Sequence, residues 1–363
     1  MAKVCSQCIM PDTYPGISIQ DGICNFCKIQ PKFKTGQNTL LGRDKLLRLL
    51  ANNNGDKYHC VIPLSGGKDS SYVAFYVARV MGLNPLLVCF DNGFMTDTAK
   101  KNIRNLCNIL DLDLVEKNSS KYYQRQIKES LVIFKKLKGR YSLRCGNCET
   151  NNRTAAISVA TNRKIPFILW GSTDYEDPPD SKKNGKTFRE VSGTTRQVLL
   201  QLRNLPLMIA RHIIFSRNPA ITFNIIMYLF YGMKDRMEIR ASTVNPFRTA
   251  PFLDSERLST LYFYDYIKYD IYDQIKTLKE EVNWKAPEGK EDKMDCKLAI
   301  FKNYQSIKRT GISANGTRLS SLIRNGIINR AHALEKEMIV RNDIEKDYSE
   351  MTRSLSRSFN INL

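Results

Sequence analysis

The sequence predicts an α/β protein built on a doubly wound, mostly parallel sheet. Short apolar runs that are typical of strands alternate with helical patterns along the first half of the chain. Such alternation implies right-handed crossovers between parallel strands, with helices on both faces of the sheet. The strands are expected at residues 58–64, 84–90, 112–116 and 165–170, with helices at 98–110 and 153–161.

The chain is long enough for this fold, and it is strongly basic. It has 363 residues, of which 42% are hydrophobic, enough for one large core or two modest ones with an appendage. Lys and Arg number 56 against 36 Asp and Glu, which gives a net charge of +20. This excess predicts an anionic partner, such as nucleic acid, a nucleotide-sugar diphosphate or an acidic membrane surface. The residues after Met1 lack the apolar core of a signal peptide, so the ten cysteines are expected to be thiols and metal ligands of a cytoplasmic protein.

A short polar loop follows the first predicted strand and leads into a helical pattern. Its sequence is Ser65-Gly66-Gly67-Lys68-Asp69-Ser70-Ser71. Adjacent glycines let the backbone approach an anion closely, and the N-terminus of the next helix points its free N–H groups at the same place. Lys68 adds a positive charge, and the serines add hydroxyl donors. The segment therefore predicts a phosphate-binding loop.

This loop differs from a Walker A loop, which needs glycine at the position of Ile62 and a magnesium-binding hydroxyl at the position of Asp69. It instead resembles the PP-loop, Ser-Gly-Gly-Lys-Asp-Ser, of ATP pyrophosphatases, which release pyrophosphate and transfer AMP to a carbonyl oxygen. A Gly-Gly turn with a charged tip is the structural alternative. The resemblance makes Ser65, Lys68 and Asp69 the expected catalytic residues, and ATP and Mg²⁺ the expected ligands.

Two further strand ends are expected beside the loop, because ligands of doubly wound sheets bind beyond the carboxyl ends of the strands. Residues 91–93 follow the second predicted strand, and residues 171–177 follow the fourth. Asp91 is a candidate ligand of the ribose or of Mg²⁺, although a role as a turn or helix-cap residue explains it equally well. The complete predicted ATP-binding set is Ser65, Gly66, Gly67, Lys68, Asp69, Ser70, Ser71, Asp91 and Gly171.

The N-terminus carries two C-x-x-C pairs, Cys5/Cys8 and Cys24/Cys27. Two such pairs, sixteen residues apart, can close four thiolates tetrahedrally around Zn²⁺. A segment this short cannot bury a core of its own, so the metal would supply its folding free energy. We expect a closed structural zinc site, with unliganded thiols as the alternative.

A second cysteine pair, Cys145/Cys148, stands in a polar stretch without a neighbouring pair, and the candidate third ligand is the distant Cys296. A pair with a distant single cysteine resembles the three-cysteine iron–sulfur site of certain PP-loop tRNA thiolases. A second zinc, a redox pair and an inert surface pair are the alternatives. The cysteines expected in the core, because of their apolar contexts, are Cys60, Cys89 and Cys107.

Three domains are expected: a zinc module at 1–40, a PP-loop ATP-binding domain at 41–195 and a mainly helical region at 196–363. Two apolar segments of the last region, 198–215 and 219–231, are flanked by basic residues. The second has 13 residues, short of the ~20 needed to span a bilayer. Buried helices are the default interpretation, and a helix lying on an anionic membrane surface, at the inner face of the membrane, is the alternative.

A more specific resemblance extends over nearly the whole chain. Residues 5–27 read Cys-x-x-Cys-Ile-Met-Pro-Asp-Thr-x-Pro-Gly-Ile and then Gly-Ile-Cys-x-x-Cys, which resembles the start of the N-acetyl sugar amidotransferases of bacterial lipopolysaccharide O-antigen and related surface-polysaccharide biosynthesis. Further blocks resemble that family in order, at 82–92, 145–148, 165–171, 295–296 and 323–334. Residues 172–177 depart from it, because the family usually carries Glu-Asn and later Glu-Tyr-Gly-Gly there. This departure leaves open the identity of the sugar and of a substrate-binding acid.

The resemblance implies a two-step reaction on a nucleotide-linked N-acetyl sugar. The amide oxygen attacks the α-phosphorus of ATP and displaces pyrophosphate; ammonia then attacks the activated carbon, and AMP leaves an acetamidino sugar. Lys68 and Mg²⁺ would neutralise charge on the leaving pyrophosphate. Family members take ammonia from a glutaminase and a channel barrel that resemble imidazole glycerol phosphate synthase. This chain shows no glutaminase Cys/His arrangement, its histidines being His59, His212 and His332.

Two other classes of function stay open. A PP-loop tRNA thiolase shares the loop, an N-terminal zinc module and the pair-plus-single cysteine set, and it would use the +20 charge directly on phosphates. Nucleic acid is nevertheless the less favoured partner. A non-enzymatic nucleotide-binding scaffold in a polysaccharide assembly complex is the third interpretation.

Overall fold

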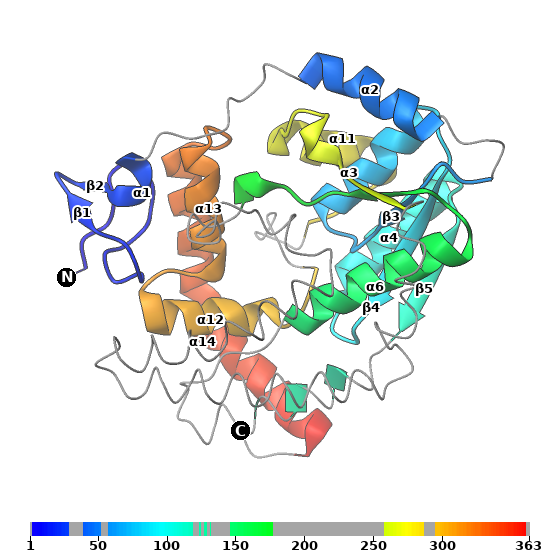
Figure 1. Ribbon diagram of the computed structural model, residues 1–363. Coiled ribbons are helices and arrows are strands. Elements are labelled where there is room, and N and C mark those ends of the chain that lie inside the picture. Colours follow the sequence, from blue (N-terminus) through cyan, green and yellow to red (C-terminus); the bar gives the residue numbers. More distant parts are fainter. Residues whose placement is uncertain are drawn as a thin grey trace, which may run out of the picture.

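The computed structural model describes residues 2–28, 39–51, 57–118, 146–176, 258–286 and 295–360, together with five positions between 123 and 131. It contains a sheet of five parallel strands in the order β5-β4-β3-β6-β7, on the right-hand side of Figure 1. The strands are β3 (Cys60–Pro63), β4 (Pro85–Asp91), β5 (Leu114–Asn118), β6 (Phe167–Trp170) and β7 (Ser259–Tyr262).

Successive side chains of the central strands enter two different hydrophobic cores. In β3, Cys60 and Ile62 belong to one core, whereas Val61 belongs to the other. In β4, Leu87 and Leu86 divide in the same way. Side chains of a strand point alternately to opposite faces, so both faces of this sheet are buried. The predicted doubly wound α/β fold is confirmed.

Helices cover both faces of the sheet. One core includes side chains of α3 (Lys68–Phe75), α4 (Asp97–Leu110) and α11 (Ile271–Val282), and the other includes side chains of α6 (Gly146–Asn162). The π-helical turn η1 (Tyr76–Val80) extends α3. Polar side chains cap two of these helices: Thr96 caps α4 by accepting from the Ala99 N–H, and Asp270 caps α11.

Three helices after the sheet pack against one another: α12 (Ala299–Thr310), α13 (Ala314–Arg324) and α14 (Arg330–Phe359). Ser313 caps α13, its hydroxyl accepting from the Gly316 N–H at 2.7 Å. Buried Glu337 of α14 accepts hydrogen bonds from both the N–H and the hydroxyl of Ser313. The start of α13 is therefore fixed to α14.

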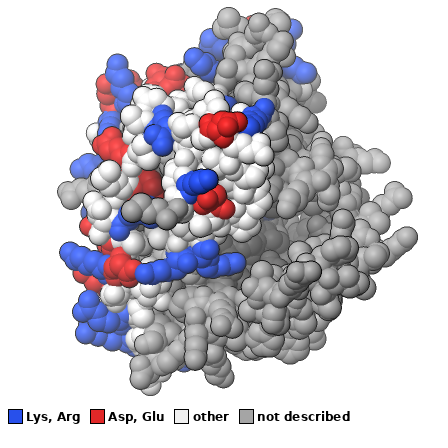
Figure 2. Space-filling model, turned by 90° about the vertical axis from the view of Figure 1, so that its left-hand side faces the viewer, with Lys and Arg blue, Asp and Glu red and all other residues white. Residues whose placement is uncertain are grey.

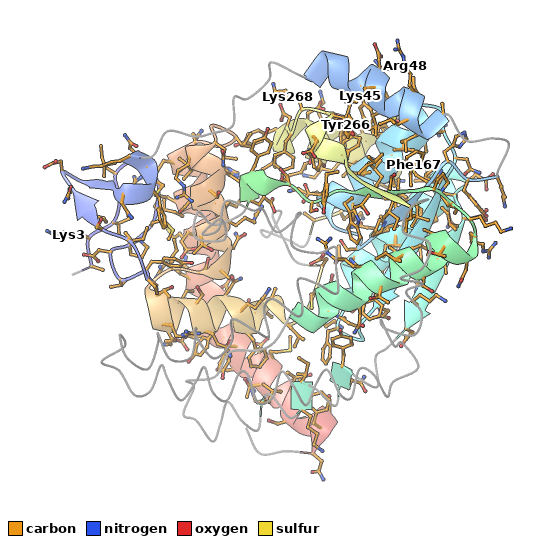
Figure 3. The ribbon with its side chains drawn as sticks, viewed as in Figure 1. Lys3, Lys45, Arg48, Phe167, Tyr266 and Lys268 are labelled. Atoms are coloured by element: carbon orange, nitrogen blue, oxygen red, sulfur yellow. The ribbon has the colours of Figure 1, made fainter. Side chains whose placement is uncertain are left out.

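The N-terminal segment forms a small module against these C-terminal helices (Figure 1). It contains β1 (Ile19–Gln20) and β2 (Ile23–Cys24), paired antiparallel, and the single-turn α1 (Asn25–Lys28). The next helix, α2 (Thr39–Ala51), lies instead against the segment that links β7 to α11 (Figure 3). There the Gly42 backbone comes so close to that of Tyr266 that a Cβ would clash.

The structure confirms the four predicted strands. Some helices and strands begin or end at other residues than predicted. The helix expected at 153–161 begins earlier, at Gly146, so Cys148 lies within α6. The strand β7 was not predicted, and it joins the sheet edge beside β6. The apolar segments at 198–215 and 219–231 and Cys145 lie outside the described residues. The division into three domains remains a prediction.

Two observations bear on the surface. Within the described ranges, no helix is both long and apolar enough to cross a membrane. On the described part of the face in Figure 2, Lys and Arg side chains lie among Asp and Glu side chains. Although the net charge of the chain is +20, positive and negative side chains are interspersed on that part of the face.

Candidate functional site

The polar loop lies between the end of β3 at Pro63 and the start of α3 at Lys68, as the sequence predicts. Gly66 has a φ of +77°, which side chains other than glycine rarely adopt. A Cβ at Gly66 would also clash with the carbonyl oxygen of Ala99 in α4. Glycine is thus required here both for backbone conformation and for the close approach of α4.

Two side chains hold the Gly66 peptide in place. The Gly66 carbonyl oxygen accepts from Trp284 Nε1 at 3.0 Å and from Asn102 Nδ2 at 3.2 Å. Asn102 is buried and is itself fixed by hydrogen bonds to both backbone groups of Lys285. The turn of the loop is therefore anchored from α4 and from the end of α11. Sequence analysis did not single out Asn102 or Trp284.

The loop serines bond to one another and to the loop backbone. The hydroxyls of Ser65 and Ser70 lie 3.2 Å apart, and Ser70 Oγ also accepts from the Ser65 N–H at 3.2 Å. Ser65 Oγ accepts from the Gly67 N–H at 3.3 Å. Ser71 is fully buried, and its hydroxyl has no hydrogen-bond partner among the described residues. The loop thus presents Ser65 and Ser70, whereas Ser71 lies in the interior.

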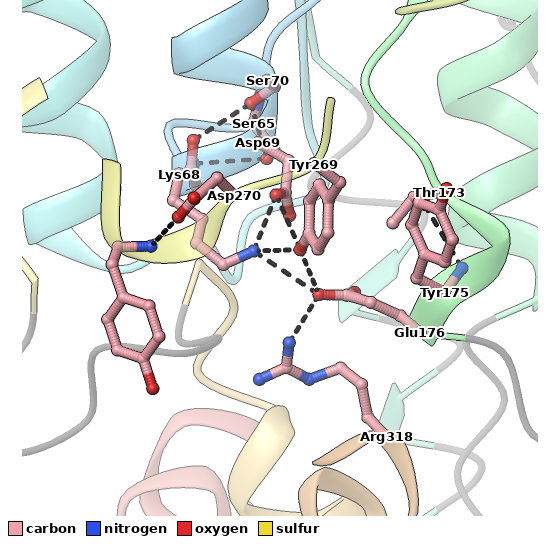
Figure 4. Close-up of polar contacts among 12 residues, drawn as sticks. Ser65, Lys68, Asp69, Ser70, Thr173, Tyr175, Glu176, Tyr269, Asp270 and Arg318 are labelled. Carbon is pink, nitrogen blue, oxygen red and sulfur yellow. Dashed lines mark hydrogen bonds and ion pairs between the residues drawn. The ribbon is translucent and has the colours of Figure 1, made fainter. Parts of the chain in front are cut away.

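Lys68 lies at the centre of a polar cluster (Figure 4). Its ammonium donates to Asp69 Oδ1 at 2.6 Å, to the Tyr269 hydroxyl at 2.8 Å and to Glu176 Oε1 at 3.4 Å. The Tyr269 hydroxyl in turn donates to Glu176 Oε1 at 2.9 Å. Burial raises the pKa of Tyr269, and the charges of Asp69 and Glu176 raise it further, so this hydroxyl stays a hydrogen-bond donor at neutral pH.

Arg318 of α13 joins the same cluster from the C-terminal helices (Figure 4). Its Nη1 donates to Glu176 Oε1 at 2.5 Å, and its Nε donates to Asn315 Oδ1 at 3.1 Å. Glu176 belongs to the short 3₁₀ turn η2 (Asp174–Glu176), which follows the end of β6. Residues from three distant parts of the chain therefore meet at Lys68.

The two predicted contacts outside the loop have different surroundings. Gly171, just after β6, lies beside the loop, because a Cβ there would be 3.2 Å from the Asp69 backbone. Asp91, at the end of β4, accepts from the Gly93 N–H at 2.7 Å and pairs with Lys100 at 3.2 Å. These contacts are typical of a turn residue, the alternative that the sequence left open for Asp91.

The four N-terminal cysteines come together as predicted. The sulfurs of Cys5, Cys8, Cys24 and Cys27 all lie within 4.8 Å of one another. Backbone N–H groups approach these sulfurs, with Cys24 N at 3.2 Å from Cys5 Sγ. Arg330 of α14 donates to the backbone carbonyls of Cys8 at 2.9 Å and of Cys5 at 3.3 Å, so the module is fixed to the helical region.

The electrostatics of this cluster fit a bound cation. The hydrogen bond to Cys24 raises the pKa of Cys27 well above that of an ordinary thiol and raises the pKa of Cys8 to about 11, while the pKa of Cys24 falls to about 2. One thiolate thus suppresses ionisation of its neighbours, because like charges cannot accumulate at this distance without a cation. Four sulfur ligands at this spacing suit tetrahedral Zn²⁺, which would deprotonate them all.

The second cysteine set is only partly described, because Cys145 lies outside the described residues. Cys148 Sγ lies 3.2 Å from Asn92 Nδ2, just beyond the end of β4. Cys296 forms a backbone bridge with Met95 of the same loop. Both described members therefore border residues 92–95.

The cysteines expected in the core have the predicted environment. Cys60 and Cys89 are buried, and Cys107 is partly buried. Burial raises the pKa of the Cys60 and Cys89 thiols to about 12 and that of Cys107 to about 11. Such thiols stay protonated and behave as small apolar residues.

Comparison with known proteins gives distant similarities. No family model matches the chain. The chain is 25% identical over 270 residues to the glutamine-hydrolyzing GMP synthases of Thermotoga petrophila and Thermotoga maritima, covering 71% of this chain and 50% of theirs. It is 29% identical over 113 residues to the uncharacterized protein MJ1599 of Methanocaldococcus jannaschii, covering 31% of this chain and 41% of that protein. The chain thus spans about half, or less, of the length of these curated relatives.

Among solved structures, the chain is similar to the U34-tRNA thiolase NcsA of Methanococcus maripaludis, solved with its 4Fe-4S cluster. The TM-score is 0.38 and the identity 13%, with 85% of this chain and 79% of that chain covered, so this likeness carries no functional argument. The similarity to the GMP synthases agrees with the loop described above. The loop and this similarity support a PP-loop-like ATP site, and the comparisons do not extend to the sugar amidotransferases.

Proposed function

We propose that this chain is an ATP-dependent amidotransferase that converts the N-acetyl group of a nucleotide-linked sugar into an acetamidino group, in bacterial surface-polysaccharide biosynthesis. The observation that supports ATP chemistry is the position of the Lys68 ammonium. An ammonium at the first residue of α3 lies beside the loop of Ser65 and Gly66, where backbone N–H groups and the helix dipole favour an anion. The choice of a sugar acceptor rests on the sequence blocks shared with the amidotransferases.

In the proposed reaction, the sugar amide oxygen forms a bond to the α-phosphorus of ATP, and the bond to pyrophosphate breaks. Ammonia then adds to the imidate carbon, a proton is lost to solvent, and AMP leaves with the former amide oxygen. Lys68 stabilises charge on the pyrophosphate, and Ser65 and Ser70 orient it through their hydroxyls. Mg²⁺, held with ATP by the Asp69 carboxylate, would supply further charge neutralisation, and a carboxylate oxygen is a suitable ligand for it.

We further propose that ammonia comes from a separate glutaminase with a channel barrel. The matched GMP synthases are named as glutamine-hydrolyzing, and the chain spans only half of their length. The two described histidines have structural contacts: His59 Nδ1 accepts from the Asn84 N–H at 3.0 Å, and the His332 ring packs edge-on against Tyr272. His212 lies outside the described residues. These contacts give both rings structural roles, and the proposed ammonia donor rests on the sequence blocks shared with the amidotransferases.

A PP-loop tRNA thiolase is the second candidate, and one observation favours it. Cys148 and Cys296 both border residues 92–95, at the carboxyl end of β4 and thus on the ligand-binding edge of the sheet. A thiolase would use cysteines placed there for sulfur transfer. An amidotransferase would use them only structurally.

The experiment that separates the candidates measures pyrophosphate release from ATP with two classes of acceptor. Purified protein is given Mg²⁺, ammonium chloride and either a panel of UDP-N-acetyl sugars or bulk tRNA. We expect pyrophosphate and AMP in equal amounts with a sugar and ammonia together. Lys68→Ala should abolish this release, whereas Lys308→Ala, at an exposed lysine of α12, should not. Release with tRNA alone would favour the thiolase, and none with any acceptor would favour a binding scaffold.

A further inference from the structure

Glu176 has an unusual position in the cluster around Lys68. Its Oε1 atom accepts hydrogen bonds from three side chains: Lys68 of the loop, Tyr269 before α11 and Arg318 of α13. Lys68 lies 3.4 Å from this oxygen but only 2.6 Å from Asp69 Oδ1, so the stronger contact of the ammonium is with its neighbour in the loop. Arg318 makes the shorter contact with Glu176.

These charges are withdrawn from solvent. The side-chain exposure is 2% for Lys68, 10% for Glu176 and 7% for Arg318. Buried charges are tolerated when they are paired, and loss of one partner leaves the other uncompensated. Among the described residues of this cluster, two cations and two carboxylates, counting Asp69, pair with one another.

The arrangement limits how strongly Glu176 attracts Lys68. Arg318 shares the same carboxylate oxygen, so part of the Glu176 charge is already compensated before Lys68 is considered. Without Arg318, the uncompensated carboxylate would draw the ammonium toward itself and compete with ATP phosphates for it. Asn315 fixes the Arg318 guanidinium, and the Ser313 cap fixes the start of α13.

We propose that Arg318 and Glu176 are positioning residues of the ATP site: Arg318 neutralises Glu176, and this keeps the Lys68 ammonium directed at the phosphates. The inference rests on the proposed ATP chemistry but not on the identity of the acceptor. It explains why a helix from the last part of the chain reaches the loop that follows β3. It gives Glu176, which lies where the chain departs from the amidotransferase pattern, a role in ATP binding instead of in sugar recognition.

The test is a double-mutant cycle read out as equilibrium ATP binding, which needs no acceptor. Arg318→Gln should weaken ATP binding by roughly tenfold or more, the scale of one hydrogen bond to a charged group. Glu176→Gln in the same background should restore most of that loss, because the competing carboxylate is gone. Arg318→Lys should retain most of the affinity, since it keeps the positive charge.

Lys308→Gln is the control. Lys308 of α12 pairs with Glu345 of α14 at 2.6 Å, and both side chains are exposed. This variant should leave ATP affinity unchanged. Unchanged ATP binding in Arg318→Gln, or losses in the double variant that simply add, would overturn the positioning role alone. Wild-type protein that fails to bind ATP would overturn both this inference and the proposed function.

Discussion

The phosphate loop and the four-cysteine module both crowd ionisable groups into a small space, and they neutralise those groups in different ways. Around Lys68, cationic and carboxylate side chains from distant parts of the chain pair with one another. Around Cys24, the four ligand atoms are all sulfurs, which can be balanced as thiolates only by an added cation. The loop is therefore organised by the protein's own side chains, whereas the module presents four sulfur ligands that fit a metal ion.

The largest effect is expected when a side chain is introduced at Gly66 of the loop. Gly66→Ala places a Cβ against the Ala99 carbonyl, and the loop must move away from α4. Pyrophosphate release should fall by roughly 10²-fold or more, as when a preorganised charge-stabilising group is lost. Gly82→Ala is the matched control, because Gly82 has a φ of +66° but open space around its Cβ position. Equal losses in both variants would show that backbone strain at a left-handed glycine, wherever it lies, lowers activity as much as the clash of Gly66 with α4 does.

The next effect concerns the metal. Cys24→Ser should release the bound zinc and unfold the N-terminal module, lowering solubility more than it alters ATP binding. Metal analysis by mass spectrometry and limited proteolysis of residues 2–28 measure the two changes. Cys107→Ser, at a partly buried thiol outside the cluster, should keep the zinc. Wild-type protein isolated without zinc would contradict the account of the module.

A smaller effect is expected at the contact between the module and α14. Arg330→Gln removes the donors to the carbonyls of Cys5 and Cys8, which should cost about 1–3 kcal/mol of local stability. Hydrogen exchange of the amides of residues 5–10 should accelerate while zinc stays bound. Arg309→Gln, at an exposed position of α12, should leave this exchange unchanged. Exchange as slow as in the wild type would show that the metal alone holds the module.

The smallest effect is expected at an exposed ion pair, which serves as a baseline for both clusters. Asp113 accepts hydrogen bonds from Lys57 at 2.7 Å and from Tyr58 at 2.6 Å, and the bond from Lys57 lowers the pKa of Asp113. A lowered carboxyl pKa stabilises the fold above the unfolded value of about 4, and the contribution disappears as pH falls through the folded value. Asp113→Asn should therefore lower stability slightly at neutral pH and not in strong acid. Urea unfolding at both pH values measures this, and a difference that persists in acid would contradict it.

The sequence predicts the parts of the fold that rest on local pattern. Continuous apolar runs identify the buried strands, and the Gly66-Gly67 pair before Lys68 identifies the loop. In the edge strand β7, Ser259 and Thr260 are exposed and Leu261 and Tyr262 are partly buried, so neither a buried run nor a strict alternation marks it. The four-cysteine cluster is predictable because metal ligation fixes the spacing of its residues.

The residues that complete the polar cluster around Lys68 are not predictable in this way. Tyr269 and Arg318 are brought to the loop by long-range packing, with Lys68 and Tyr269 separated by 201 positions in the chain. Their types, a tyrosine and a helical arginine, are common on any protein surface. Glu176 had one signal, its place after the fourth predicted strand, but only the structure pairs it with Lys68 and Arg318. Residue spacing in the sequence predicts local turns and sets of metal ligands. It does not predict which distant charged side chains come together, because tertiary packing determines that.

In the proposed reaction, the amide oxygen of an N-acetyl sugar attacks ATP at its α-phosphorus. The most direct measurement uses a UDP-N-acetyl sugar whose acetyl oxygen carries a heavy isotope, incubated with ATP, Mg²⁺ and ammonium chloride. The account predicts that the AMP formed carries the heavy oxygen and that the sugar product has lost it. Heavy oxygen retained in the sugar, or ADP formed in place of AMP, would contradict the account.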